Sequence, residues 1–156
     1  MRAVFFEHLG GLVGVKKLQV EEWTLLIDIP KTKDVYEKIK YRNDMVEWLN
    51  YMEVCSFKDP QVLTFFENLG IDILKPSQLS YYPVEEGTMM MYTGSYHLCG
   101  EIVEGQMDGW DLIIAGHCFS LTQEHNAIPQ EMSGNILEIS FEVVLPWILD
   151  ISIPAK

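Results

Sequence analysis

The clearest pattern in the chain is an alternation of apolar and polar residues near its C-terminal end. Residues 135–145 are predicted to form a strand, and within them Leu137, Ile139, Phe141 and Val143 alternate with Glu138, Ser140 and Glu142. A period of two is typical of a β-strand that buries one face. Residues 89–103 and 110–122 are also strand-like, and the second is apolar on both faces, as expected of a central strand.

A further strand is predicted in the N-terminal half, over residues 17–29. Its apolar positions alternate with polar ones from Trp23 to Ile29, and Pro30 closes the run. Three glycines precede it, at positions 10, 11 and 14. Residues 1–9 therefore form a short element that the pattern assigns to neither strand nor helix.

Two helices are predicted between these strands. The first covers residues 34–53: Asp34 followed by Glu37 is typical of a capping box, and apolar residues then recur at helical spacing. Asn43-Asp44 could kink this helix or split it in two. The second covers residues 59–70, with Asp59 as its N-cap, Pro60 at its first position and Gly70 at its end.

The order of these elements is a strand, two helices and then a three-stranded meander. That order predicts an α+β fold with a mainly antiparallel sheet and helices packed on one face. Residues 76–87 are predicted to form a loop. Because no repeat, low-complexity segment or linker interrupts the chain, residues 1–156 are expected to form a single α+β domain. Several α+β folds share this order, and no motif in the chain selects one of them.

Lysine and arginine are absent from residues 76–155, although acidic residues occur along the whole chain. Residues 1–75 carry 10 basic and 12 acidic residues, a net charge of 10 − 12 = −2. Residues 76–156 carry one basic and 11 acidic residues, a net charge of 1 − 11 = −10. The resulting field attracts cations and repels phosphates. We therefore expect a cationic partner, and the same charge argues against nucleic-acid and membrane-surface binding.

The sequence also favours a cytoplasmic setting. No apolar run reaches the roughly 18 residues that span a bilayer, and Glu7 and His8 interrupt the apolar start before a signal peptide can form. The three cysteines, Cys55, Cys99 and Cys118, are odd in number and form no CxxC pair. They are thus expected to be reduced thiols rather than part of a disulfide framework.

One group of residues could carry chemistry if residues 105–109 turn a hairpin between the segments 89–103 and 110–122. In that register His97 lies opposite His117, and Cys99 and Glu101 point to the same sheet face as both histidines. A shift of one residue would instead place the two imidazoles on opposite faces.

These residues could have a purely structural role, or they could serve one of three functions. His97, His117 and Cys99 could ligate zinc, which imidazole and thiolate suit. Cys99 beside His97 could act as a nucleophile and its base. Glu101, with aromatic residues such as Tyr92 and Tyr96, could line a pocket for a cationic organic ligand.

Two functional classes therefore remain. The first is a non-catalytic binding protein whose acidic β-rich half engages a cationic small molecule or a basic protein surface. The second is a small enzyme or metal-binding protein that uses the His/Cys/Glu group on the sheet. The charge distribution favours the first class, which requires no cofactor. The two histidines favour the second class. Long strands without edge lysines are also consistent with a homodimer that covers a sheet edge.

Overall fold

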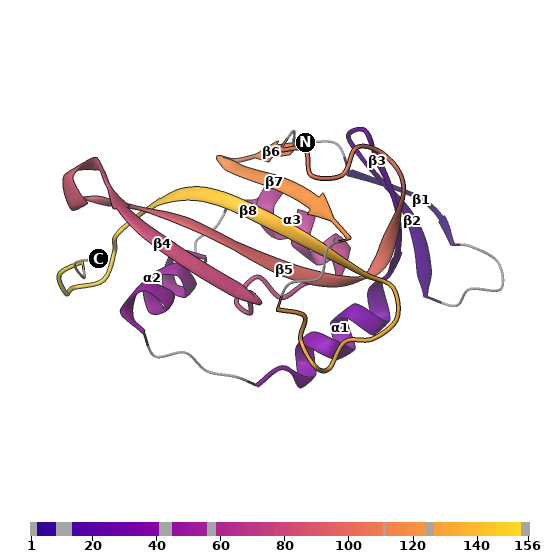
Figure 1. Ribbon diagram of the computed structural model, residues 1–156, viewed down its shortest axis with the longest axis horizontal. Helices are drawn as coiled ribbons and strands as arrows, with labels where there is room; N and C mark the ends of the chain where they lie inside the picture. The colour runs from indigo at the N-terminus through magenta and orange to yellow at the C-terminus, as the bar shows by residue number, and fades with distance from the viewer. Residues whose placement is uncertain are drawn as a thin grey trace.

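The computed structural model describes residues 3–8, 14–40, 45–55, 59–110, 112–123 and 127–153. These residues form β-strands, α-helices and one short 3-10 helix (Figure 1). In chain order the elements are β1 (Ala3–His8), β2 (Val15–Val20), β3 (Trp23–Asp28), α1 (Ile29–Lys38), α2 (Val46–Cys55), α3 (Pro60–Leu69), β4 (Gln78–Val84), η1 (Glu85–Gly87), β5 (Met89–Glu104), β6 (Leu112–Ile114), β7 (His117–Thr122) and β8 (Ile136–Pro146). The predicted α+β class is confirmed.

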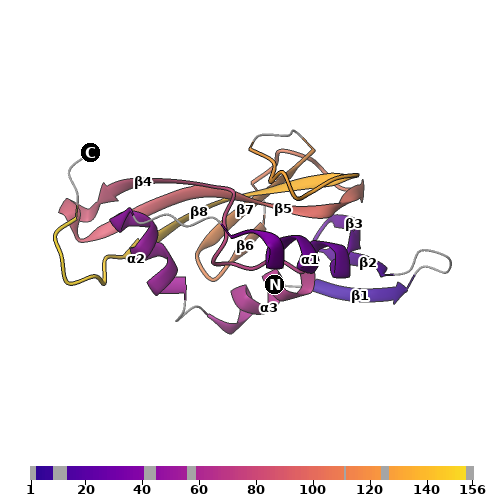
Figure 2. The ribbon, with the colours of Figure 1, turned by 90° about the horizontal axis from the view of Figure 1, so that it is seen from below.

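The strands form one antiparallel sheet with the order β1-β2-β3-β5-β8-β7-β6, and β4 pairs with β5 beside this path. The helices α1, α2 and α3 lie on one side of the sheet, and residues 127–135, which precede β8, lie on the other (Figure 2). We call these sides the helix face and the outer face. Within the described residues, no helix is long and apolar enough to cross a membrane.

The predicted order of the meander is wrong, because β8 rather than the segment 110–122 lies beside β5. A turn at Ala115 and Gly116, both with positive φ, divides that segment into the hairpin of β6 and β7. The two short strands cannot match the length of β5, whereas β8 pairs with it continuously from Met89 to Cys99. Residues 105–110 consequently lead to the far edge of the sheet instead of turning a hairpin.

A second hidden turn divides the predicted strand 17–29. β2 and β3 form a hairpin around Glu21 and Glu22, and Glu21 has a φ of 51°. The left-handed region favours glycine, so a glutamate there gives no sequence signal for the turn. Residues 1–9, left unassigned by the pattern, include the strand β1.

The helices start and end largely where capping residues place them. α3 has the predicted Asp59 cap, whose carboxylate accepts a hydrogen bond from the Gln61 N–H, and the predicted left-handed Gly70 at its end. The first helix begins earlier than predicted, because Asp28 caps it and Pro30 lies in its first turn. It is followed by a separate α2, and the proposed break at Asn43-Asp44 lies outside the described residues. The predicted loop 76–87 contains β4.

Aromatic side chains join the helices to the helix face. Phe65 and Phe66 of α3 contact Phe119 of β7, with ring centroids 5.1 and 5.7 Å away, and Phe66 also packs against Tyr96 at 4.8 Å. All four rings are buried. Since burying each such ring contributes about 1.5–3 kcal/mol, this contact fixes the sheet against α3.

β5 changes its neighbour halfway along one edge. Residues 89–95 pair with β4 on that edge and residues 100–104 pair with β3, while β8 occupies the other edge. Among the described strands, none lies beside residues 96–99 on the first edge, which leaves a gap between β4 and β3. A side-chain Cβ at Gly94 would lie 2.3 Å from the Gln78 carbonyl oxygen, and one at Gly100 would lie 2.4 Å from that of Leu26. The two neighbouring strands thus approach β5 closely at both ends of the gap.

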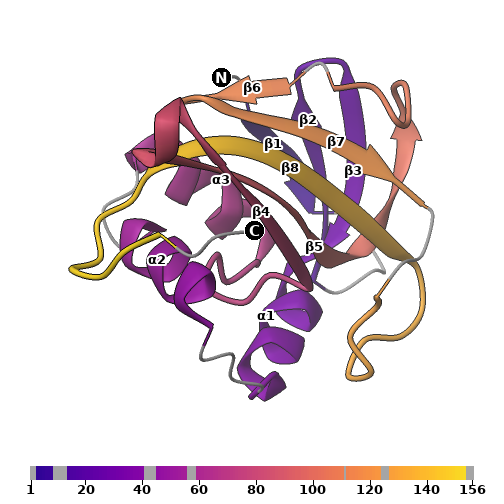
Figure 3. The ribbon, with the colours of Figure 1, turned by 60° about the vertical axis from the view of Figure 1, so that its left-hand side comes forward.

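Two hydroxyls of α1 fill this gap. The Tyr36 hydroxyl donates a hydrogen bond to the His97 carbonyl oxygen at 2.7 Å and accepts one from the His97 N–H at 3.1 Å. The Thr32 hydroxyl accepts from the Cys99 N–H at 3.0 Å and donates to the Asp28 carbonyl oxygen at 2.8 Å. Buried backbone groups need partners, so α1 takes the place of the missing strand (Figure 3).

Tyr36→Phe tests this role of α1. The change leaves the buried N–H and C=O of His97 without their partner, so the free energy of unfolding should fall by about 2–4 kcal/mol. Urea denaturation measures it. The matched control is Tyr82→Phe, in which a side chain that is 49% exposed loses the same oxygen. Equal effects of the two changes would contradict the assignment.

Candidate functional site

The outer face of the sheet carries rows of polar side chains across neighbouring strands. Because directly opposed residues share a face, the pairing of β4, β5, β8 and β7 defines these rows. One row holds Ser80, Thr93, Glu142 and Cys118; the next holds Gln78, Ser95, Ser140 and Ser120; the third holds His97, Glu138 and Thr122. Hydroxyls and carboxylates therefore cover the face opposite the helices.

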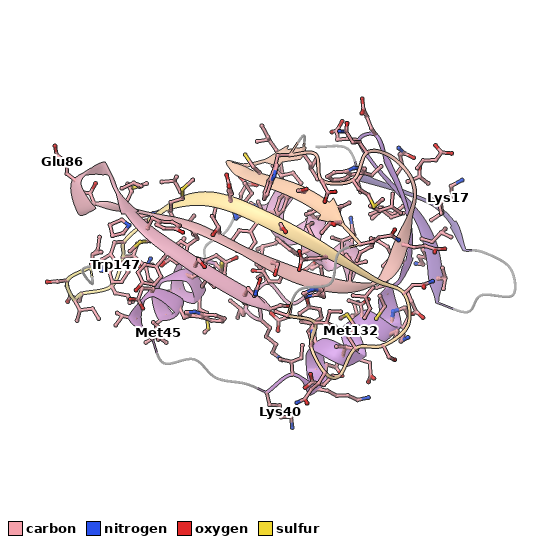
Figure 4. The ribbon with its side chains drawn as sticks, viewed as in Figure 1. Lys17, Lys40, Met45, Glu86, Met132 and Trp147 are labelled. Carbon is pink, nitrogen blue, oxygen red and sulfur yellow. The ribbon has the colours of Figure 1, made fainter. Side chains whose placement is uncertain are left out.

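Part of this face forms a trough with a volume of about 710 Å³. Its floor comes from the polar rows of β4, β5 and β8. Met45, Trp48 and Trp110 add large apolar side chains to its lining, and Figure 4 labels Met45 below β4. Glu138 and Glu142 are its acidic members, and the described lining contains no lysine or arginine. The trough thus combines aromatic surface, hydroxyls and negative charge.

Ser95 gives the trough a polar group that the fold leaves unused. Its side chain lines the trough, the residue is 3% exposed, and its hydroxyl has no hydrogen-bond partner among the described residues. Buried polar groups are normally paired, and each unpaired one costs about 1–3 kcal/mol. A ligand that donates or accepts a hydrogen bond at this point would recover that loss.

His97 lies next to the trough, in contact with two polar side chains. Its Nδ1 is 2.7 Å from the Ser77 hydroxyl oxygen, and its Nε2 is 3.3 Å from Oε1 of Glu138. The Ser140 hydroxyl donates to Oε2 of Glu138 at 3.4 Å. The histidine is fully buried, and Glu138 is 6% exposed. Sequence reasoning singled out His97 but not these partners.

His117 lies elsewhere, so the predicted pairing of His97 with His117 is wrong. β8 separates β5 from β7, and the residue opposite His97 is Glu138. The register places His117 on the helix face, where its ring stacks on Phe119 with centroids 5.6 Å apart. Two histidines on opposite faces cannot ligate one zinc ion. The described part of the chain contains no group of three metal-ligating side chains.

Cys99 and Glu101 share the outer face with His97 by alternation along β5, but they border a separate depression of about 250 Å³. Burial raises the pKa of the Cys99 thiol, despite an opposing hydrogen bond with Thr32. A raised pKa lowers the thiolate fraction, so Cys99 is poorly suited to be a nucleophile. The Asn135 side-chain amide donates to Glu101 at 3.5 Å.

Tyr92 and Tyr96 point to the helix face and are fully buried. The Tyr92 hydroxyl donates to the Glu47 carbonyl oxygen at 2.7 Å and accepts from Asn50 at 3.1 Å, and burial raises its pKa to about 12. The Tyr96 hydroxyl donates to the Ile73 carbonyl oxygen at 2.6 Å. Burial also raises the pKa of Tyr96 well above its usual range. Both rings thus join helices and loops to the sheet and lie away from the trough.

The residues that sequence reasoning missed are Ser77, Ser95 and the two carboxylates of β8. Glu138, Ser140 and Glu142 were visible as the polar half of an alternating strand. Their convergence with Ser77 and Ser95 depends on β4, which carries proline and was interpreted as loop. The alternation in the sequence identified the β8 residues that line the floor of the trough. The order of the strands was needed to show which residues of β4 and β5 lie beside them.

Models of known protein families, curated proteins and solved structures were all compared with this chain, and none of them matched. The function is therefore inferred from the geometry and chemistry of the site itself.

The environments of the thiols predict different reactivities. With iodoacetamide at pH 8, the half-buried Cys118 should react first, and the buried Cys99 should react at least roughly tenfold more slowly because its raised pKa and burial limit thiolate attack. Peptide mass spectrometry over time measures both rates. In denaturant the difference should disappear. Equal rates in the native protein would contradict the burial of Cys99.

Proposed function

We propose that the protein is a binding protein that holds a cationic organic small molecule in the trough of the outer face. The observation that carries this proposal is the presence of Glu138 and Glu142 together with aromatic side chains in one trough, whose described lining holds no basic residue. A carboxylate attracts an ammonium group, and a tryptophan face attracts the same cation. The volume also lies in the range typical of small-molecule sites, roughly 300–1,000 Å³.

The net charge of the protein also favours a cationic ligand. Residues 76–156, which supply most of the trough, carry a net charge of −10. Such a field speeds the approach of cations and opposes anionic ligands. The unpaired hydroxyl of Ser95 adds a hydrogen-bonding group for the polar part of the ligand.

A basic protein surface is the second occupant that the chemistry allows, since a lysine side chain presents the same ammonium group. The size of the trough and its aromatic lining favour the small molecule. A homodimer through a sheet edge, with β1 and β6 at the ends of the strand order, stays a prediction.

Glu142→Gln tests the proposed charge recognition. Spermidine and choline serve as cationic probes in isothermal titration calorimetry, and citrate serves as the anionic comparison. Loss of a charged hydrogen bond costs about 1.5–3 kcal/mol, so Glu142→Gln should weaken binding of the preferred cation at least roughly tenfold. Raising the salt from 20 to 300 mM should also weaken it.

The matched control is Glu67→Gln, which removes the same charge from an exposed position of α3, away from the trough. Its affinity should stay within about twofold of the parent protein, the change expected of a distant, screened charge. Equal losses in both variants would show non-specific attraction to the negative protein. Binding of a lysine-rich peptide but of neither amine would favour the basic protein surface, and preference for citrate would contradict the proposal.

A further inference from the structure

The contacts of His97 link three residues that are distant in the sequence. Ser77 lies directly before β4, His97 lies in the middle of β5, and Glu138 lies in β8. The imidazole stands between the other two side chains, with Nδ1 at 2.7 Å from the Ser77 hydroxyl and Nε2 at 3.3 Å from the Glu138 carboxylate. A hydroxyl, an imidazole and a carboxylate in this order are the parts of a nucleophile, its base and the group that orients the base.

The tautomer set by these contacts suits proton transfer. Nε2 and Oε1 of Glu138 are close enough for charge attraction, although their contact does not have hydrogen-bond geometry in this structure. An ionised Glu138 favours a proton on Nε2, because a carboxylate attracts and can only accept that proton. The lone pair of Nδ1 then faces the Ser77 hydroxyl and can take its proton. Glu138 also stabilises the imidazolium that this transfer produces.

Two of the three groups, the serine and the histidine, are held in place by hydrogen bonds of their backbone. The backbone N–H and C=O of His97 are both bound by the Tyr36 hydroxyl, and the Ser77 N–H donates to the Ser95 carbonyl oxygen at 2.7 Å. The fold therefore fixes the serine and the histidine by bonds that do not involve their reactive atoms. Such support is what a preorganised catalytic group requires.

Ser77 is also accessible from a cavity that is distinct from the trough. It is half-buried and lines a depression of about 460 Å³, together with Ile39, Lys40, Pro129 and Gln130. His97 lies behind it with no exposed surface. Figure 4 labels Lys40, which belongs to this lining. The nucleophile thus faces a space that could hold a small molecule, while the base is shielded from water.

We propose that Ser77, His97 and Glu138 form a catalytic relay that hydrolyses small carboxylic esters in this second cavity. The Ser77 oxygen bonds to the ester carbonyl carbon while its proton moves to Nδ1 of His97, and the carbonyl electron pair moves onto oxygen. The tetrahedral intermediate expels the alkoxide, which takes the proton from Nδ1 and leaves an acyl-serine. Water then attacks in the same way, releasing the carboxylic acid and restoring Ser77.

The test uses the full chain, a fluorophosphonate probe and p-nitrophenyl acetate. The probe forms a bond from phosphorus to an activated serine oxygen and releases fluoride, and peptide mass spectrometry identifies the labelled residue. Label on Ser77, together with esterase activity that falls at least roughly 100-fold in Ser77→Ala, is the expected result. Ser133→Ala removes an exposed hydroxyl in the nearby segment and should keep both label and activity.

Glu138→Gln separates a relay from simple packing. The amide keeps the shape of the side chain but cannot stabilise the imidazolium, so the esterase rate should fall at least roughly tenfold, with the melting temperature of each variant checking its fold. Ser77→Ala should leave the affinity of the trough for spermidine unchanged, which keeps this proposal separate from the binding function. Absence of label on Ser77, or equal rates for the parent protein and Ser77→Ala, would overturn the proposal.

Discussion

The hydrogen bonds of the Tyr36 hydroxyl to His97 are the interaction on which the rest of the structure depends. β5 is shared by the two parts of the sheet, since it pairs first with β4 and then with β3 along one edge. An unfilled gap between those strands would leave buried backbone groups without partners in the middle of the longest strand. Tyr36 and Thr32 fill the gap from α1, and they thereby also fix that helix against the sheet.

This arrangement divides the molecule into a structural face and a polar face. The helix face holds the aromatic core and the tyrosines whose hydroxyls bind backbone carbonyls of the helices and loops. The outer face is left with hydroxyls and carboxylates, and Glu138 belongs both to the lining of the trough and to the contacts of His97. Because His97 sits at the gap, the bonds that complete the sheet also position the imidazole between Ser77 and Glu138. Stability and the candidate chemistry therefore depend on the same stretch of β5.

Local signals in the sequence predicted some elements well. Asp59, Pro60 and Gly70 placed α3 correctly because capping depends only on neighbouring residues. Alternation located β8, and the strand-like segment 89–103 corresponds to β5. The turns at Glu21 and Ala115 were missed because each has a positive φ without glycine at that position. The predicted strand order was wrong because a hairpin between consecutive strands was assumed. In the structure the chain passes from β5 to β6 at the edge of the sheet, and β8, the last strand, pairs with β5.

The candidate site was only partly predictable from the sequence, for the same reason as the strand order. His97 was singled out from its residue type and from an assumed hairpin register that proved wrong. Its actual partners follow from long-range pairing that the sequence does not display. His117 has the same residue type and a packing role on the other face, which only the register reveals. The negative charge of the C-terminal half was readable at once, because it needs no structure. Charge therefore suggests the kind of ligand that we propose, and the strand order locates the trough in which we expect it to bind.

Amide hydrogen exchange of His97 and Cys99, followed by NMR, tests the central role of the gap most directly. Both N–H groups point away from β8 and are bound by hydroxyls of α1. We predict that they exchange as slowly as the amide of Leu98, which lies in the stretch of β5 paired with β8. Fast exchange at His97 and Cys99, with Leu98 still protected, would show that the edge of β5 is open and would contradict the account.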